Sequence, residues 1–581
     1  MGSVMKQKSL NIMIGGEAGQ GLVTLSQILT KAIVRAGYQI VVTQSYQSRI
    51  RGGHNTYMLR VGPEEILAPR EGIDVLLALN RETVDIHSKE MKPGGIVVLD
   101  SALGFMEASY VAVPFKSLTS DKHWNATAIG ALSELLGLDE AIVTSAASDF
   151  FSSHAADSLD ENLNSASAGR EWVRKNSSVF SGLTKPETNG RHLMMNGNEA
   201  IALGALSAGM KVCCFYPMTP ATSVALALCG HARQMNIVTE QAEDEISAIN
   251  MAIGASFCGA PSLVPTSGGG FALMAEGLSL SGMTETPVVV VLAQRPGPST
   301  GLPTRTEQSD LEFALHAGHG EFPRAIFAPG SVDECFWLTR KAFEIADTFR
   351  IPAIIMTDQF LADCYCAVEP FPLEELNPVD VCADSHTNSK PHLTYKLTDS
   401  GVSPRLFPGL SEKCVVARSD EELVIADSDE HTEDGHLTED LAIRVKMVDK
   451  RNRKLDGIKR SLNDFTFHED REPELLMVCW GSTKGSVQEA CDELRNEGKK
   501  VACAHFSQVW PINTESVSDV LNSANRVVAV EGNSTGQFAG LLRRETGYHI
   551  SRNILRYDGL PITPEYILEK LRAEAQHDQA Q

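Results

Sequence analysis

The chain has 581 residues, of which 43% are hydrophobic and 22% are charged, and its formal net charge at pH 7 is -23. This length accommodates roughly three or four domains, and the composition indicates a globular protein. The acidic balance argues against nucleic acid or an anionic membrane as the main partner, and we attribute it to solubility.

The first apolar run, LNIMI (10–14), is short and follows MGSVMKQKSL directly, without the apolar stretch of a secretory signal. The longest uniformly apolar runs, such as VVVVLA (288–293), are far too short to cross a bilayer. We therefore expect a cytoplasmic protein with no membrane partner.

Twelve cysteines are scattered along the chain, and no pair has the Cys-x-x-Cys spacing. Zinc and iron–sulfur sites need thiolates that converge, usually at short spacings. We therefore expect no metal and no iron–sulfur cluster on this chain.

Residues 10–142 alternate short apolar runs with amphipathic patterns. A helical pattern spans 22–37, and buried strands are predicted at 39–44, 73–79 and 95–100. Strands that alternate with helices predict a parallel α/β sheet.

A glycine loop, GGEAGQG (15–21), lies between the first predicted strand and the first predicted helix. Backbone N–H groups at such a junction can hold a phosphate, which makes Gly16, Gly19 and Gly21 candidate ligands. The spacing G-x-x-G-x-G differs from the dinucleotide fingerprint, so a plain tight turn is an equal alternative.

The next segment, SYQSRIRGGHNTYMLRVG (45–62), gathers Arg49, Arg51 and His54 beside two glycines. It is interpreted either as an anion-gripping loop or as a solvated basic turn. Residues 144–190 are rich in Ser, Asn and Ala, with weak periodicity, and are expected to be a linker with one helix around Gly169 to Val179.

A second α/β domain begins near residue 190, and polar residues follow its predicted strands. Thr219 lies in FYPMTPAT (215–222), four acidic residues lie in VTEQAEDE (238–245), and three glycines lie in PTSGGGFALM (265–274). A loop rich in Pro, Gly and Thr then spans 293–310. Open parallel sheets build ligand sites at such strand ends, so we expect a site here.

The remaining chain divides into three stretches. Residues 325–363 predict another strand, helix and strand that close the second domain near 370. Residues 371–470 are irregular: the acidic segment 419–440 fails the EF-hand pattern at His431 and Thr432, and 441–459 predicts a basic helix. The last 110 residues resume the α/β pattern.

Several of these motifs occur together in one order. YPMTPAT, EDEISAINMAIGAS, TSGGGFALM and GPSTGLPTRTEQSD resemble the alpha subunit of 2-oxoacid:ferredoxin oxidoreductases, which use thiamine diphosphate and coenzyme A. GGEAGQG with SRIRGGHNTY resembles the gamma domain of that family, fused here ahead of the alpha part. VVAVEGNSTGQFAGLLRR is similar to a transketolase C-terminal-like domain.

The resemblance implies an α/β multidomain fold. The expected parts are a gamma-type domain ending in a Ser/Asn-rich linker, a pyrimidine-binding thiamine diphosphate domain, an irregular linker region and a transketolase C-terminal-like domain. Their expected bounds are 1–185, 190–370, 371–470 and 471–581.

The resemblance also implies residue roles. Glu245 is expected to face N1′ of the thiamine aminopyrimidine, although it would otherwise be interpreted as a helix N-terminal charge, like Glu240, Glu243 and Asp244. Arg305 is expected to grip the substrate carboxylate, with Thr219 as hydroxyl partner and Arg295 as a weaker candidate. A loop-tethering role is the alternative for Arg305, and a tight turn for the glycines. The expected cofactor-binding residues are Gly268, Gly269, Gly270, Gly16, Gly19, Gly21, Arg49 and His54.

The implied reaction is coenzyme A-dependent oxidative decarboxylation of a 2-oxoacid, preferably 2-oxoglutarate, or its reverse. No G-D-G…N-N diphosphate motif is found, so a beta subunit is expected to supply the diphosphate and Mg²⁺ half, the iron–sulfur cluster and the route to ferredoxin. The alternatives are pyruvate or a branched-chain 2-oxoacid as substrate, a transketolase-like enzyme, and a noncatalytic scaffold subunit.

Overall fold

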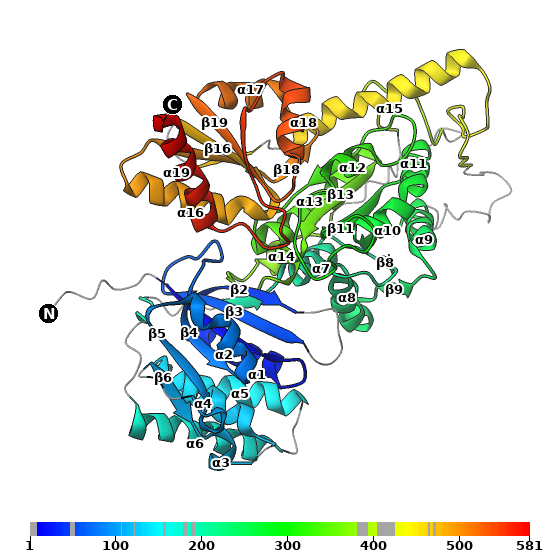
Figure 1. Ribbon diagram of the computed structural model, residues 1–581. Coiled ribbons are helices and arrows are strands. Elements are labelled where there is room, and N and C mark those ends of the chain that lie inside the picture. The colour runs from blue at the N-terminus through cyan, green and yellow to red at the C-terminus, as the bar shows by residue number, and fades with distance from the viewer. Residues whose placement is uncertain are drawn as a thin grey trace. The chain divides into compact units, whose positions relative to one another are not determined.

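The chain forms two compact units, each described here by itself. The first unit comprises Met1–Asn196, Asp363–Phe371 and Thr563–Tyr566, and the second comprises the rest of the chain. Within the described residues, no helix is long and apolar enough to span a membrane. The computed structural model (Figure 1) describes residues 9–46, 53–105, 107, 109–120, 122–154, 158–177, 183–187, 192–379, 393–403, 425–462, 465–468 and 472–580.

An eight-stranded sheet in the order β6-β5-β4-β1-β3-β2-β14-β7 forms the centre of the first unit. Its strands are β1 (Leu10–Glu17), β2 (Gln39–Ser45), β3 (His54–Gly62), β4 (Ile73–Ala78), β5 (Met91–Asp100), β6 (Tyr110–Val113), β7 (Leu193–Met195) and β14 (Cys366–Val368). The strands predicted at 39–44, 73–79 and 95–100 are therefore confirmed.

The wholly parallel sheet predicted for residues 10–142 is wrong. Strand β3 runs antiparallel to both β1 and β2, with Val61 opposite Leu10 on one side and Ile40 on the other. Residues 54–62, which we interpreted as part of a loop, alternate buried Tyr57, Leu59 and Val61 with more polar positions. That period of two is the pattern of a strand, and the neighbouring Arg and Gly residues obscured it.

Helices cover this sheet, and they include most of the expected linker. They are α1 (Leu22–Arg35), α2 (Arg81–His87), α3 (Phe115–Leu118), α4 (Trp124–Leu135), α5 (Glu140–His154) and α6 (Leu159–Asn176). Helices α4 and α6 pack closely, because a Cβ at Gly130 would lie 1.8 Å from the Ala166 carbonyl oxygen and one at Gly169 would lie 2.1 Å from the Thr127 carbonyl oxygen. Small residues form this contact, so residues 144–154 and 159–176 are helical although their hydrophobic periodicity is weak.

The second unit contains a seven-stranded sheet in the order β18-β12-β13-β11-β10-β8-β9. Its strands are parallel except β18 (Gln508–Trp510), which comes from the C-terminal part of the chain and pairs antiparallel with β12. The parallel strands are β8 (Val212–Phe215), β9 (Val238–Gln241), β10 (Ser262–Thr266), β11 (Val288–Gln294), β12 (Ala325–Phe327) and β13 (Pro352–Asp358). Their carboxyl ends therefore meet at one edge, as the sequence predicted.

Helices between these strands bury the sheet. They are α7 (Gly197–Ser207), α8 (Thr222–Met235), α9 (Glu245–Phe257), α10 (Gly268–Leu273), α11 (Ala275–Met283), α12 (Leu311–His316), α13 (Val332–Phe349) and α14 (Gln359–Asp363). The strands β7 and β14, at the two ends of the domain expected at 190–370, join the sheet of the first unit. The four-part domain division stays a prediction.

The last part of the chain adds a five-stranded sheet in the order β15-β17-β16-β19-β20, which is parallel except at its edge strand β15. Figure 1 shows its helices in orange and red around this sheet. Its elements are β15 (Thr466–His468), β16 (Leu475–Trp480), α16 (Lys484–Asn496), β17 (Val501–Phe506), α17 (Thr514–Asn522), β19 (Arg526–Glu531), α18 (Gln537–Thr546), β20 (Arg552–Leu555) and α19 (Pro564–Ala580). The predicted return of an α/β pattern is confirmed.

The basic helix predicted at 441–459 is α15 (Leu441–Ser461), and one of its faces is buried. Lys450 and Lys454 are fully buried and clasp Glu285, with Nζ to carboxylate oxygen distances of 2.6 and 2.5 Å. Burial would raise the pKa of Glu285, but Lys454, Lys450 and Arg350 outweigh it and hold the pKa well below its usual range. Burial also lowers the pKa of Lys454 to about 8, against the opposing effect of Glu285.

Replacing Glu285 tests this buried charge cluster. We expect Glu285→Gln to lower the free energy of unfolding by about 3–5 kcal/mol, because two buried ammonium groups would lose their counter-charge. Urea denaturation followed by circular dichroism measures the change. The exposed Glu344, which pairs with Lys341, provides the control: Glu344→Gln should shift stability by less than about 1 kcal/mol. Equal effects of the two changes would contradict the assignment.

Candidate functional site

Glu245 is the first residue of α9, and its side chain points into the protein. The preceding Asp244 caps the helix, since its carboxylate accepts the backbone N–H of Ser247 at 2.7 Å. Because Asp244 caps the helix, the Glu245 side chain does not. It is only 3% exposed, and its Oε1 atom has no hydrogen-bond partner among the described residues. Such a buried polar atom costs free energy unless a ligand satisfies it.

The other acidic residues of this segment lie where the sequence predicted. Glu240 and Glu243 are exposed, and Asp244 occupies the N-cap position of α9. The backbone N–H of Ser247 holds the pKa of Asp244 below its usual range. Glu245 is therefore the one buried carboxylate of the four.

The glycine segment Gly268–Gly270 gives Glu245 its space. A Cβ at Gly270 would lie 2.5 Å from Glu245 Oε1 and 2.3 Å from Thr266 Oγ1, so no side chain fits there. Gly269 differs, because it is exposed and its Cβ would meet only Met218 Cε, at 3.9 Å. The close approach at Gly270 is thus a requirement of the site.

Arg295 holds the loop that carries Thr219. The Arg295 side chain follows β11, and its Nη1 donates to the carbonyl oxygen of Thr219 at 2.7 Å. Burial lowers the pKa of Arg295, and the nearby Asp310 opposes that shift. The structure therefore brings Thr219, Arg295 and the glycine segment, through Met218, to one edge of the sheet.

The loop that carries Arg305 is fastened to the C-terminal part of the chain. The backbone N–H of Gln308 donates to the Gly532 carbonyl oxygen at 2.6 Å, and its side chain bonds to Trp480 O at 2.9 Å and to Gly532 N at 2.8 Å. Thr306 N donates to Gly559 O at 3.2 Å, and a Cβ at Gly559 would lie 3.0 Å from Arg305 Cβ. The C-terminal part thus sets the backbone position of the half-buried Arg305.

Two polar residues at the glycine segment, Asp310 and Ser267, escaped the sequence analysis. Asp310 packs against Gly268, whose Cβ would lie 2.6 Å from Asp310 Oδ2. That oxygen and the Ser267 hydroxyl are buried without a hydrogen-bond partner among the described residues. Burial raises the pKa of Asp310 to about 6, Glu307 adds to the increase, and Arg295 opposes it. In the sequence, the acidic segment TEQSD (306–310) draws attention to Asp310, but it does not show that a carboxylate oxygen of this residue is buried.

The other predicted residues lie in the first unit. Gly19 and Gly21 have φ values of 98° and 80°, and the Gln20 side chain closes the turn by accepting the Glu17 N–H at 2.8 Å. Gly21 precedes α1, where its Cβ would lie 2.0 Å from Asn125 Nδ2, whereas Gly16 lies within β1. Residues 17–21 therefore form a tight turn, and phosphate binding by this turn stays a prediction. Arg49 lies outside the described residues.

His54 begins β3 beside this turn. Its Nε2 lies 2.8 Å from His87 Nε2, and His87 Nδ1 lies 3.0 Å from Glu90 Oε2. Burial lowers the pKa of His54, and His87 lowers it further, against the effects of Glu82 and Glu90. His54 is therefore a neutral imidazole at pH 7 and suits hydrogen bonding better than charge attraction.

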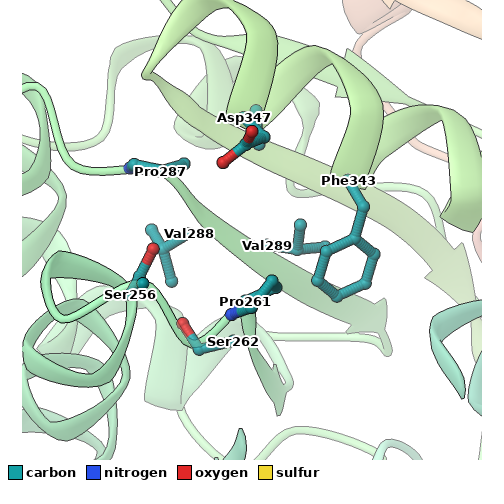
Figure 2. A pocket seen from close by; sticks show the side chains of 10 residues that line it. Ser256, Pro261, Ser262, Pro287, Val288, Val289, Phe343 and Asp347 are labelled. Atoms are coloured by element: carbon teal, nitrogen blue, oxygen red, sulfur yellow. The ribbon is translucent and has the colours of Figure 1, made fainter. Parts of the chain in front are cut away.

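A small pocket opens at the opposite end of the strands of the second unit (Figure 2). It lies beside the first residues of β10 and β11, Ser262 and Val288, with Phe343 and Asp347 of α13 on the other side. Its wall is largely apolar and lacks the unpartnered carboxylates described above. Among the described residues, no group of three or more His, Cys, Asp or Glu is placed to hold a metal ion.

Three protein-family models match the chain in sequence order. "Pyruvate ferredoxin/flavodoxin oxidoreductase" covers residues 11–172, "Pyruvate flavodoxin/ferredoxin oxidoreductase, thiamine diP-bdg" covers 203–450, and "Pyruvate:ferredoxin oxidoreductase core domain II" covers 473–567. The second model contains Glu245, the glycine segment and both arginines.

Individual proteins match over nearly the whole length. The 2-oxoacid:ferredoxin oxidoreductase subunit alpha of Sulfolobus sp is 29% identical over 97% of this chain and 96% of its own. The 2-oxoglutarate oxidoreductase subunit KorA of Mycobacterium tuberculosis is 29% identical over 93% of this chain and 88% of its own. A solved structure of 2-oxoglutarate:ferredoxin oxidoreductase from Magnetococcus marinus, with 2-oxoglutarate, coenzyme A and succinyl-CoA bound, is 30% identical, with a TM-score of 0.90 over 98% of this chain and 100% of that one.

Two glycine substitutions test the space that Gly270 provides. We expect Gly270→Ala to weaken thiamine diphosphate binding at least about tenfold, because its methyl group would displace Glu245 and overpacking costs about 1–3 kcal/mol. Gly540→Ala adds the same methyl group on the exposed side of α18, where the nearest atom would be Glu312 Oε1 at 4.0 Å, and should stay within about twofold of the wild type. Calorimetric titration of the protein, isolated with the expected beta subunit, measures both. Equal affinities would show that Gly270 does not shape the cofactor site.

Proposed function

The chain belongs to the 2-oxoacid:ferredoxin oxidoreductases, and on that basis we propose that it is the fused gamma and alpha subunit of an enzyme acting on 2-oxoglutarate. The reaction is coenzyme A-dependent oxidative decarboxylation to succinyl-CoA, or the reverse carboxylation. The observation that carries the proposal is the buried, unpartnered Oε1 of Glu245 beside Gly270. The preference for 2-oxoglutarate is supported by the similarity to the Magnetococcus marinus and Mycobacterium tuberculosis proteins, which are both named for that substrate.

Glu245 is the residue that we assign to the cofactor. Bound thiamine diphosphate supplies the carbanion that adds to the keto carbon of the substrate. Glu245 would share a proton with N1′ of the aminopyrimidine. Its Oε1 atom suits that hydrogen bond because it is buried and has no other hydrogen-bond partner among the described residues. Gly268, Gly269 and Gly270 would let the cofactor approach the backbone.

We assign substrate binding to the loop after β8, which carries Thr219, and to the loop after β11, which carries Arg295 and Arg305. Arg305 would pair with a carboxylate of the 2-oxoacid through its guanidinium fork, and the Thr219 hydroxyl would donate to the same substrate. Arg295 already donates to the Thr219 carbonyl oxygen, so its first task is to hold that loop. It reaches the substrate only with its remaining N–H groups.

The glycine turn of the first unit is our candidate for coenzyme A. Gly16, Gly19 and Gly21 lie at the junction of β1 and α1, where backbone N–H groups and the helix dipole favour phosphate. His54, beside the turn, would donate or accept a hydrogen bond, and Arg49 of the same motif would supply positive charge. Titration of the complex with coenzyme A, before and after His54→Ala, tests this assignment, and unchanged affinity would contradict it.

The face of the second unit next to Glu245 is apolar and exposed. Strand β9 is an edge strand, and α8 and α9 flank it. Its exposed apolar side chains are Leu226, Met235, Val238, Ile246 and Met251. We assign this face to a beta subunit, which would bring the diphosphate and Mg²⁺ half of the site, the iron–sulfur cluster and the contact with ferredoxin. The complex would work in the cytoplasm.

Co-purification with a candidate beta subunit and a substrate panel test the whole proposal. The assay is coenzyme A-dependent reduction of a low-potential acceptor dye with 2-oxoglutarate, pyruvate and branched-chain 2-oxoacids. Preference for pyruvate or a branched-chain acid would replace the substrate but keep the enzyme class. Dye reduction with none of them would leave a transketolase-like or scaffold role, and isolation without any partner would contradict the beta-subunit assignment.

Glu245 is tested by an isosteric change. We expect Glu245→Gln to lower kcat by at least about 10³-fold, because the amide cannot share the proton at N1′, while co-purification with the partner stays unchanged. Glu243→Gln, two residues earlier and exposed, is the control and should keep wild-type turnover. Near-normal turnover of Glu245→Gln would move the assignment to another carboxylate.

Arg305→Lys tests this residue, because lysine keeps the positive charge but lacks the planar guanidinium group. We expect Arg305→Lys to raise the KM for the 2-oxoacid about tenfold with a smaller change in kcat, because an ammonium group cannot form two parallel hydrogen bonds to a carboxylate. Steady-state kinetics of dye reduction give both constants. An unchanged KM would indicate that Arg305 only tethers its loop.

A further inference from the structure

Asp310 is a carboxyl group that the assignments above leave unused. It stands at the N-cap of α12, where an aspartate side chain normally caps the helix, yet it makes no cap hydrogen bond within the described part of the chain. Its backbone N–H donates to Gln294 Oε1 at 3.0 Å, and Gln294 Nε2 donates in turn to Thr357 O at 3.1 Å. The backbone is therefore anchored, and the carboxyl group is available for another task.

The Asp310 carboxyl lies on the same glycine segment as Glu245. Its Oδ2 atom packs against Gly268, and Glu245 Oε1 packs against Gly270, two residues along the chain. Both oxygens are buried and lack a hydrogen-bond partner among the described residues, as does the hydroxyl of Ser267, which directly precedes Gly268. Three unsatisfied polar atoms around one short segment mark the position of a polar ligand.

We propose that Asp310 binds the 2-oxoacid in its protonated form, so that substrate binding takes up a proton from the solvent. This inference rests on the function proposed above. An ionised Asp310 would add a negative charge near Glu307, which disfavours an anionic substrate. A protonated Asp310 removes that charge and donates its O–H to a substrate oxygen, and the proton returns to the solvent when the ligand leaves.

The charged surroundings set the direction of the effect. Burial and, to a smaller extent, Glu307 raise the pKa of Asp310 to about 6, against the opposing effect of Arg295. Arg295 already donates to the Thr219 carbonyl oxygen. An arriving carboxylate raises the pKa again, because like charges favour the neutral form. At neutral pH the free site is therefore mostly ionised, and the occupied site is protonated.

The pH dependence of KM provides the test. Between pH 6 and 8 we expect the KM for the 2-oxoacid to rise by up to about tenfold per pH unit, because the protonated fraction of Asp310 falls at that rate. Asp310→Asn should give a low KM that is independent of pH, since a carboxamide donates a hydrogen bond at every pH. Glu312→Gln, on the first turn of α12 and exposed, should keep the wild-type slope.

Proton uptake gives a second readout that needs no turnover. Calorimetric titration of the complex, freed of thiamine diphosphate, with the 2-oxoacid at pH 7 in two buffers of different ionisation enthalpy gives the number of protons bound. We expect close to one proton per ligand in the wild type and none in Asp310→Asn. Absence of proton uptake in the wild type, or an unaltered KM slope in Asp310→Asn, would overturn the inference. A complex that turns over no 2-oxoacid would instead overturn the proposed function.

Discussion

The site depends on a buried carboxylate that the protein leaves unsatisfied. Glu245 lies at the first turn of α9, where the positive end of the helix dipole favours a negative charge, and Asp244 takes the capping task from it. The missing side chain at Gly270 makes room for the carboxylate, because a Cβ there would lie 2.5 Å from Oε1. The cap at Asp244, the missing side chain at Gly270 and the position after a parallel strand together leave Glu245 Oε1 buried and without a hydrogen-bond partner among the described residues.

The loop that we propose to bind the substrate is held in place by a different part of the chain. Gln308 bonds through both backbone and side chain to Trp480 and Gly532, which lie at the ends of two strands of the C-terminal sheet. Strand β18 reinforces this arrangement by pairing with β12. The C-terminal part therefore positions the loop that carries Arg305 and Asp310.

The sequence predicted those features that depend on local pattern. Periodicity gave α1, α13 and the buried strands, and the spacing of the motifs placed Glu245 at a strand–helix junction. The sequence analysis failed where contacts between residues far apart in the chain determine the structure. The small residues around Gly130 and Gly169 turned an expected linker into packed helices. Lys450 and Lys454 were predicted on a basic helix, but their burial depends on Glu285, which lies over 160 residues away. Asp310 owes its burial in the same way to Gln294 and Gly268.

Two kinds of buried carboxylate therefore coexist in the second unit, and their surroundings separate structure from function. Glu285 is matched by two lysines and by Arg350, so its charge is satisfied before any ligand arrives, and its pKa lies below the usual range. Glu245 and Asp310 keep buried oxygens without partners, and burial raises the pKa of Asp310. An unpaired buried carboxyl lowers the stability of the free protein, and that cost is recovered only when a ligand completes the hydrogen bonds. The contrast supports the glycine segment, and not the lysine cluster, as the proposed cofactor and substrate site.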